Sequence, residues 1–594
     1  MLLLYDCMRL LKTVTPIIPR LTLLVGVLLI APVIGPSSTV TAAATSAPVD
    51  IALKKLVASG STTVQRVIAR AQPGQYSALK KYVLGQAGWS LAREFPRTNA
   101  LTVVMPLTSV TTLASQTSLV RSVSIDAALK AHQVSGDSGP VDLVRDTLGL
   151  TSTSPKGSGV TVAVIDSGIY PSADFGTRIT GFFDFVKGNG KSVPPSDEYG
   201  HGTHVAGLIA GSGALSGGAY TGVAPNVNLI GMKVLDQDGN GKVSDVIQAL
   251  EFATANKVAL GIDVINLSLG HVILESATTD PLVQAIQDAV QAGIVVVASA
   301  GNTGVNPDTG LPGFGGILSP GNAPAAITVG SQNMQGTSQR ADDTVNNYSS
   351  RGPSWYDGFA KPDVVAPGYR LVSLAAPNST LATTYPSLLV ADTGGNASYM
   401  TLSGTSMAAA VTSGLAALAI EANRTAFTTT RPAITPNAVK AVLEFTALSL
   451  RDPSTLTTYD PLIQGNGSIN AAGTVALAKS IDTSIAQGSW WLVQAVDPAS
   501  TIGGTSYSWA QGILWGNSIL WGNSVYTNYS AWSTSILWGN SILWGNNVLW
   551  GNNVVNGNSI LWGNNVCWGN SILWGNALPP DSQTFTSSLS VLTK

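Results

Sequence analysis

Four side chains in this sequence have the chemical types that a serine nucleophile needs. A hydroxyl is a weak nucleophile at neutral pH, so an imidazole must take its proton and a carboxylate must orient that imidazole. Hydrogen-bond donors must also stabilise the negative charge that develops on the oxyanion. The base is the scarcest part, because the chain has only four histidines. The candidate carboxylate, imidazole, hydroxyl and amide belong to Asp166, His201, Ser406 and Asn302.

Each candidate lies where an element is expected to begin or end. Asp166 ends the apolar run VTVAVID, and Asn302 ends GIVVVASAGN in the same manner. His201 lies in GHGTHVAG, whose glycines allow close approach of the backbone. Ser406 opens a helix in SGTSMAAAV, so its backbone N–H points outward at the positive end of the helix dipole.

The segments between these residues predict an α/β fold with a parallel sheet covered by helices on both faces. From Val160 onward, apolar runs such as VTVAVID and DVINLSLG alternate with amphipathic segments such as KVSDVIQALEFATANK and DPLVQAIQDAVQAG. Ligands of such sheets bind beyond the carboxyl ends of the strands. Asp166, Ser268 and Asn302 are expected at those ends.

Four segments together resemble a known family. VAVIDSGI, GHGTHVAG, ASAGN and SGTSMA are similar to the signature segments of the subtilases, the subtilisin-like serine peptidases, in that family's order of Asp, His and Ser. The resemblance implies an endopeptidase in which Asp166 orients the general base His201 and Ser406 is the nucleophile. Asn302 would donate to the oxyanion with the Ser406 backbone N–H. His204 would have a packing or hydrogen-bonding role.

The resemblance also implies a substrate site and a weaker metal site. Two segments would wall the primary specificity pocket and pair with an extended peptide as an added strand. They contain Ser268, Leu269, Gly270, Ser299, Ala300 and Gly301. No cofactor is implied for catalysis. A structural calcium ion stays open, because Asp174 approximately matches a family ligand position but the loop GSGALSGGAYTGVAP has no carboxylate.

Each candidate also has a simpler structural interpretation. A Gly-Thr-Ser at a helix start is commonly only a cap, and the acid and the amide can serve turns. A metal site is a further alternative, with ligands from His201, His204 and either Asp197 or Glu198. No third ligand motif accompanies the two histidines. Four segments in order favour the catalytic interpretation.

Composition divides the chain into four regions. Residues 1–44 place basic residues, an apolar run and small residues in the order of a secretory signal, with an uncleaved membrane anchor as the alternative. Residues 45–135 resemble the subtilase propeptide, an inhibitor and folding assistant, with an unrelated linker or binding domain as the alternative. Residues 136–485 are expected to form the catalytic domain. Residues 486–594 repeat a Trp, Asn and Gly-rich hexapeptide, as in SILWGN, and predict a repetitive β-type or disordered tail.

The net charge of the chain and the predicted secretory signal restrict the molecules that it is expected to bind. The formal net charge is -2, which gives no electrostatic support for binding nucleic acid. The expected partners are protein or peptide substrates and the chain's own propeptide, removed by self-cleavage between Asp126 and Val141. The tail would either attach the secreted or cell-surface enzyme to a surface or polymer or serve as a disordered spacer. The rival function is a catalytically silent adhesive or structural protein that acts through this tail.

Overall fold

The computed structural model describes residues 46–131, 143–306, 309–485, 492–493, 495–515 and 518–520, with four short strands between residues 554 and 574. The signal predicted at 1–44 and most of the repeats predicted at 486–594 lie outside these residues. Most of the predicted self-cleavage window lies outside them too. The short strands of the tail pair as β22 (Ile513–Trp515) with β23 (Ser518–Leu520), β24 (Val554–Asn556) with β26 (Val566–Trp568), and β25 (Ile560–Trp562) with β27 (Ile572–Trp574).

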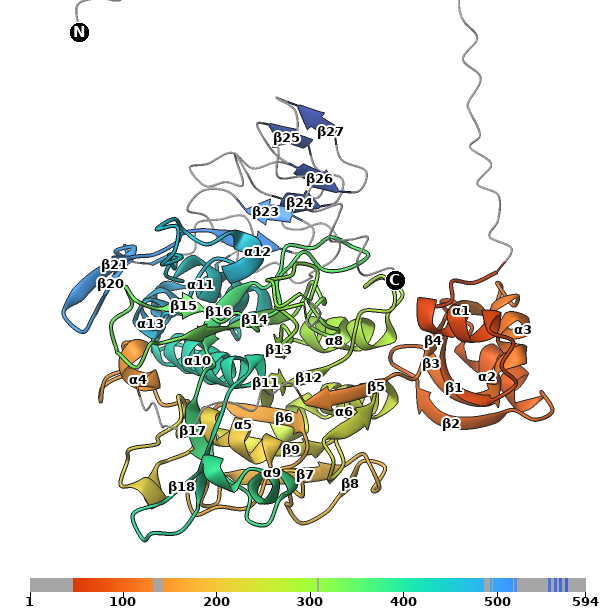
Figure 1. Ribbon diagram of the computed structural model, residues 1–594, viewed down its shortest axis with the longest axis horizontal. Helices are drawn as coiled ribbons and strands as arrows, with labels where there is room; N and C mark the ends of the chain where they lie inside the picture. The colour runs from red at the N-terminus through yellow and green to blue at the C-terminus, as the bar shows by residue number, and fades with distance from the viewer. Residues whose placement is uncertain are drawn as a thin grey trace, which may run out of the picture. The chain divides into compact units, whose positions relative to one another are not determined.

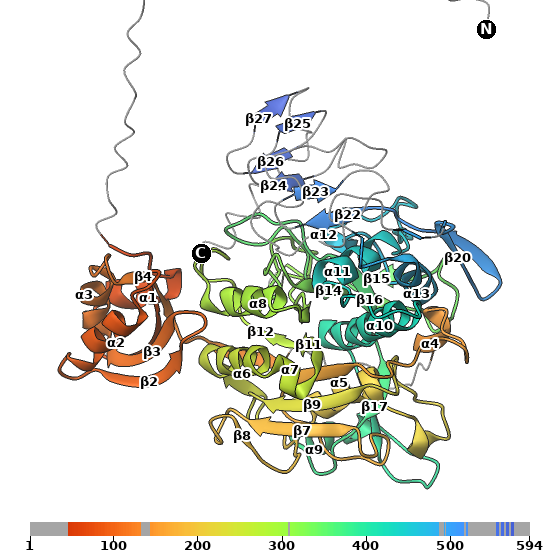
Figure 2. The ribbon, with the colours of Figure 1, turned by 180° about the vertical axis from the view of Figure 1, so that it is seen from behind.

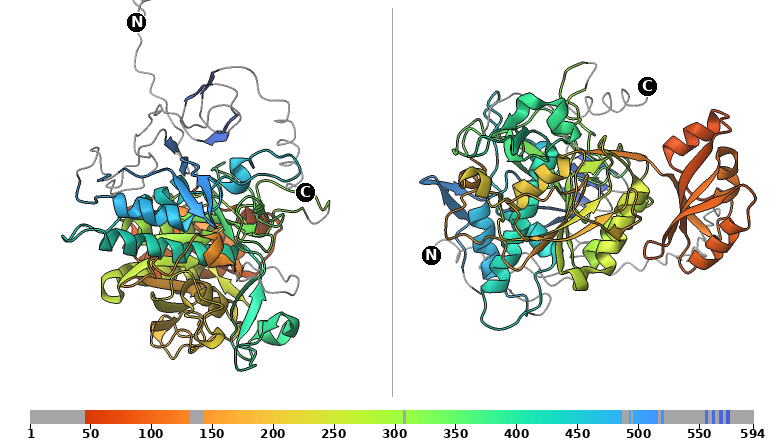
Figure 3. Two further views of the ribbon diagram at one scale, coloured as in Figure 1. Left: turned by 90° about the vertical axis from the view of Figure 1, so that its left-hand side faces the viewer. Right: turned by 90° about the horizontal axis from the view of Figure 1, so that it is seen from below.

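The first folded unit is a four-stranded antiparallel sheet with helices on one face (Figure 3). The strand order is β2-β3-β1-β4. The central strand β1 is buried on both faces: Val67 packs in the unit's own core, and Ile68 packs in the same cluster as helices α6 and α8. The elements are α1 (Ile51–Ala58), β1 (Val64–Ala71), α2 (Tyr76–Leu84), β2 (Ser90–Phe95), β3 (Ala100–Pro106), η1 (Leu107–Ser109), α3 (Val110–Ala114) and β4 (Val120–Ile125).

The larger folded part of the chain is built on the parallel sheet that the sequence predicts. Its nine strands have the order β15-β14-β13-β11-β6-β9-β7-β8, with β16 also paired to β14, and only the pairs made by β8 and β15 are antiparallel. The strands are β6 (Thr161–Asp166), β7 (Ile179–Asp184), β8 (Lys191–Ser192), β9 (Asn228–Lys233), β11 (Ile262–Leu267), β13 (Val295–Ser299), β14 (Ile327–Asn333), β15 (Thr344–Val345) and β16 (Val364–Pro367).

Helices cover both faces of this sheet, as the sequence predicts (Figures 1 and 2). Successive side chains of a strand point to opposite faces, so Val162 and Val164 pack toward α5 and α10, while Ala163 and Ile165 pack toward α6 and α8. The helices are α4 (Val144–Thr147), α5 (His201–Ala210), α6 (Val243–Ala255), α7 (Lys257–Leu260), α8 (Pro281–Gln291), α10 (Thr405–Thr425), α11 (Pro436–Phe445), α12 (Pro461–Gln464) and α13 (Ala471–Ser480). Within the described residues, α10 alone is long and apolar enough to cross a membrane, and nearly all of it is buried in the domain.

Two small sheets flank the large one. The first joins β5 (Ala128–Ala131) between β10 (Asn240–Lys242) and β12 (Leu269–Gly270), and all its pairs are antiparallel. The second has the order β17 (Leu371–Leu374), β19 (Tyr399–Leu402) and β18 (Leu389–Val390). Short turns lie beside them at η2 (Ala214–Ser216), α9 (Thr380–Thr384) and η3 (Pro386–Leu388).

The core of the large domain extends past residue 485, where composition placed the domain's end. The hairpin of β20 (Ala499–Ile502) and β21 (Thr505–Ser508) lies beside α13 (Figure 1). Trp509 follows the hairpin, is only 4% exposed, and donates from Nε1 to Ser500 Oγ at 2.8 Å. The boundary at 485 rested on tryptophan content. Trp509 packs in the core, so the folded domain reaches at least this residue.

Candidate active site

The end of strand β6 and the start of helix α5 hold a carboxylate against an imidazole. Asp166 Oδ1 and His201 Nδ1 are 2.8 Å apart, and both side chains are fully buried. The same Asp166 oxygen accepts the backbone N–H of Ser167 at 2.7 Å. A Cβ atom on Gly202 would lie 2.2 Å from the carbonyl oxygen of Gly168, so only glycine lets α5 approach the strand this closely. The imidazole orientation therefore follows from backbone packing as well as from the carboxylate.

Ser406 lies in the first turn of α10 and is fully buried. Its hydroxyl donates to the carbonyl oxygen of Ser268 at 3.0 Å, and Ser268 Oγ donates to the carbonyl oxygen of Ser406 at 3.1 Å. His201 Nε2 has no hydrogen-bond partner within the described parts of the chain. The hydroxyl thus points at Ser268 rather than at the imidazole, although α5 and α10 pack against each other. Catalytic hydrogen bonds are often unformed without substrate.

Asn302 is fixed beside Ser406 through the intervening Thr405. Its Oδ1 accepts the Thr405 backbone N–H and hydroxyl, each at 3.0 Å. The acceptor half of the amide is therefore occupied. Nδ2 is buried and has no partner among the described residues. A buried, unpaired donor costs free energy, and an oxygen atom that arrives at this position would remove that cost.

The two expected pocket walls meet at the start of α10. Ser268 contacts Ser406 as above, and the backbone N–H of Gly301 donates to Thr405 Oγ1 at 3.2 Å. The walls consist of Ser268, Leu269, Gly270, Ser299, Ala300 and Gly301, and all six are buried. Strand β12 in the first wall pairs with β5, so an extended segment of this chain already occupies the position expected for an added strand.

Comparison with known proteins identifies the family of this chain. The model of the subtilase family matches residues 157–474, which is more than half of the chain. The chain belongs to the subtilase family. Serine protease AprX of Bacillus subtilis is 38% identical over 392 residues, which cover 65% of this chain and 81% of that protein. Subtilisin E of the same organism is 34% identical over 298 residues, covering 50% of this chain and 69% of the relative.

A solved structure shows the same fold. Fervidolysin from Fervidobacterium pennivorans superposes with a TM-score of 0.53 at 20% identity, covering 73% of this chain and 63% of that one. The similarities to subtilisins and AprX make the chain a subtilisin-like serine endopeptidase, a peptidase class that needs no catalytic cofactor.

The metal alternative on the two histidines does not fit this subtilase. His204 Nε2 shares its N–H between the carbonyl oxygens of Leu371 and Met400, each at 3.1 Å. Burial lowers the pKa of His204 to about 3, so this imidazole is neutral. The described residues contain no group of three or more His, Cys, Asp or Glu side chains that could hold a metal ion. His204 therefore has the hydrogen-bonding role that the family resemblance implied.

Asp174 does not fit a calcium ligand either. Its Oδ1 accepts the backbone N–H of Leu215 and its Oδ2 accepts the hydroxyl of Tyr399, both at 2.8 Å. Calcium takes six to eight oxygen ligands, and here it would have to displace two hydrogen-bond donors from the carboxylate. Burial raises the pKa of Tyr399, and the hydrogen bond to Asp174 adds to this, so the tyrosine keeps the proton that it donates. Asp174 instead links the loop that contains Leu215, here called the 215 loop, to strand β19.

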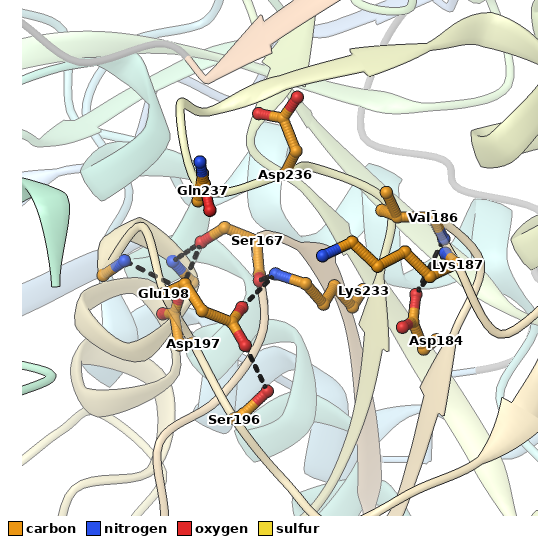
Figure 4. Close-up of polar contacts among 12 residues, drawn as sticks. Ser167, Asp184, Val186, Lys187, Ser196, Asp197, Glu198, Lys233, Asp236 and Gln237 are labelled. Carbon is orange, nitrogen blue, oxygen red and sulfur yellow. Dashed lines mark hydrogen bonds and ion pairs between the residues drawn. The ribbon is translucent and has the colours of Figure 1, made fainter.

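The sequence analysis did not predict the roles of Lys233 and Asp197 beside the Asp166–His201 pair. Lys233 Nζ donates to the carbonyl oxygen of Ser167 at 2.5 Å and lies 2.7 Å from Glu198 Oε2 (Figure 4). Asp197, considered only as a metal ligand, instead accepts hydrogen bonds from four donors around the start of α5. Asp197 lies three residues before Gly200, the N-cap residue of α5, so it is outside the usual capping position and no local pattern in the sequence pointed to this role.

Proposed function

We propose that this subtilase is a secreted endopeptidase that cleaves peptide bonds through an acyl-enzyme on Ser406. Two buried groups with no hydrogen-bond partner among the described residues carry the proposal. They are His201 Nε2, on the helix that packs against α10, and Asn302 Nδ2, on the segment bonded to α10. One is an acceptor for the hydroxyl proton when the imidazole is neutral. The other is a donor for an oxyanion.

The proposed reaction needs one small rearrangement. The Ser406 hydroxyl turns from the Ser268 carbonyl to His201 Nε2, which takes the proton as oxygen attacks the substrate carbonyl. Asp166 stabilises the imidazolium that forms, and Asn302 Nδ2 donates to the tetrahedral oxyanion. His201 then gives the proton to the leaving amine. Water next attacks the acyl-enzyme with His201 again as the base, and the acid product leaves as Ser406 regains its proton. A histidine general base works in its neutral form, so a neutral to alkaline optimum is expected for the reaction.

The test of this function is casein digestion by the purified chain. The expected result is digestion that a serine-directed fluorophosphonate blocks and that is absent in Ser406→Ala. Equal digestion by wild type and Ser406→Ala would remove the proposed nucleophile. Equal inactivity of both would favour the rival adhesive function of the tail.

We infer that residues 45–135 are a propeptide that inhibits the enzyme before removal. Support comes from β5, which lies between β10 and β12 where a substrate strand is expected, with Leu129 buried in the cluster of α6 and α8. Arg93 adds an ion pair to Asp245 at 2.5 Å. Mass spectrometry of the amino termini of wild type and Ser406→Ala tests self-processing. Identical termini would refute it.

The remaining regions complete the proposal. A signal at 1–44 would direct the chain out of the cell, and the repeats within 486–594 would attach the enzyme to a surface or polymer. Cell fractionation with and without residues 1–44 tests secretion. Retention of a repeat-deleted enzyme on the cell surface would contradict the attachment role.

A further inference from the structure

Asp197 lies between the turn that follows Asp166 and the first turn of α5. Its carboxylate is buried, with 5% of the residue exposed, and accepts four hydrogen bonds. Oδ1 accepts the Ser167 hydroxyl and the Gly200 backbone N–H, each at 2.8 Å. Oδ2 accepts the Thr203 backbone N–H at 2.8 Å and its hydroxyl at 2.6 Å. Figure 4 shows Asp197 next to Ser167 and Glu198 at this junction.

Ser167 connects this carboxylate to the Asp166–His201 pair. Its hydroxyl donates to Asp197 and accepts the backbone N–H of Gly202 at 2.9 Å. Its backbone N–H donates to Asp166 Oδ1, the oxygen that contacts His201 Nδ1. Asp166 and His201 therefore belong to two segments that a second carboxylate, that of Asp197, joins.

The chemistry of the junction demands an ionised carboxylate. Four donors converge on Asp197, and an ionised carboxylate is a pure acceptor that satisfies all of them. An amide in its place would turn two N–H groups toward donors, either at Ser167 and Gly200 or at Thr203. The negative charge also lies at the amino end of α5, where the helix dipole favours it.

We propose that Asp197 is a positioning residue of the proposed reaction, because it sets the orientation of His201 relative to Asp166 through Ser167. The inference rests on the proposed function. It differs from simple helix capping in what it predicts. A residue that only caps the helix changes the free energy of unfolding. A positioning residue also changes kcat for each correctly folded active site.

The test compares Asp197→Asn with wild type as full chains, after the active sites are counted with a fluorophosphonate. On a peptide anilide, kcat per titrated site is expected to fall about 10- to 100-fold, since small misplacement of catalytic groups costs this much. KM is expected to stay within about twofold. A loosened Asp166 stabilises the imidazolium less, so the acid limb of the pH profile moves to lower pH. An unchanged kcat per site and an unchanged acid limb would overturn the proposal.

Ser167→Ala separates positioning from capping. This variant removes the hydroxyl of residue 167, which joins Asp197 and the Gly202 backbone N–H to the segment that carries Asp166. The backbone N–H bond to Asp166 and the Asp197 bonds to Gly200 and Thr203 stay in place. A smaller loss of kcat in the same direction is expected, and the double variant should be no worse than Asp197→Asn alone, because both changes break one path. Wild-type kinetics in Ser167→Ala would overturn the proposal. If Asp197→Asn gives no titratable enzyme, the Ser167→Ala result decides by the same criteria.

Asp184→Asn is the matched control. Asp184 Oδ1 accepts the backbone N–H groups of Val186 and Lys187 at 2.8 and 3.0 Å, so it fixes its own turn (Figure 4). Wild-type kinetics are expected. An inactive wild type would refute the proposed function, whereas an active wild type with normal Asp197→Asn kinetics refutes only the positioning role.

Discussion

At the scale of single residues, the two halves of the Asn302 amide have different tasks. Oδ1 holds Thr405, and Nδ2 has no partner in the described structure. Asn302→Asp keeps the acceptor and replaces the donor with an oxygen. We expect kcat to fall by about 100-fold or more with little change in KM, the loss typical of removing one oxyanion donor.

Steady-state kinetics on a peptide anilide measure this effect. Asn256→Asp serves as the control, because Asn256 Nδ2 donates to the carbonyl oxygen of Phe252 in the last turn of its own helix, at 2.9 Å. Wild-type kcat in Asn302→Asp would show that the oxyanion is stabilised elsewhere.

His204 gives a pH dependence of stability. Burial lowers its pKa to about 3, against roughly 6.5 in an unfolded chain. Below about pH 6.5 the unfolded state takes a proton that the folded state refuses, so the free energy of unfolding should fall as pH drops toward 3. His204→Gln keeps an N–H donor but cannot titrate. Denaturant unfolding in a Ser406→Ala background should show a flatter pH dependence for this variant, and parallel curves would contradict the role of His204.

At the scale of elements, Gly202 lets helix α5 lie close to the turn that follows strand β6, because a Cβ atom there would contact the Gly168 carbonyl oxygen.

The sequence allowed prediction of the sheet, its helices and the strand-end positions of Asp166 and Asn302, because periodicity and motif order are local signals. It did not allow prediction of the Ser406 hydroxyl's direction or of the Tyr399–Asp174 bond. Such contacts join residues far apart in the chain and depend on packing that no local pattern encodes.

The Tyr399 hydroxyl is expected to stabilise the 215 loop. Tyr399→Phe leaves Asp174 Oδ2 buried without its donor, which typically costs about 1–3 kcal/mol. Thermal unfolding of Ser406→Ala with and without this change should show a lower midpoint in the variant. A chelator should leave both midpoints unchanged. A chelator-sensitive midpoint would contradict the assignment of Asp174 as a loop anchor.

At the scale of the whole molecule, strand β5 joins the first folded unit to the catalytic domain. Leu129 points into the cluster of α6 and α8, whereas the neighbouring Lys130 is exposed. In full-length Ser406→Ala, Leu129→Asp should displace β5, because a buried unpaired charge is costly. Hydrogen exchange should then show faster exchange in β10 and β12. Lys130→Asp is the control, and equal protection in both variants would contradict the docking role of Leu129.

The burial of Trp509 has a practical consequence for producing this enzyme. A truncation at the compositional boundary would remove the β20–β21 hairpin and uncover apolar side chains of α11 and α13, inviting aggregation during expression. A recombinant polypeptide that ends shortly after Trp509 keeps that surface covered. Any natural trimming that releases the peptidase from its repeats must likewise cut beyond the hairpin, so a short stub of tail would stay on the freed enzyme.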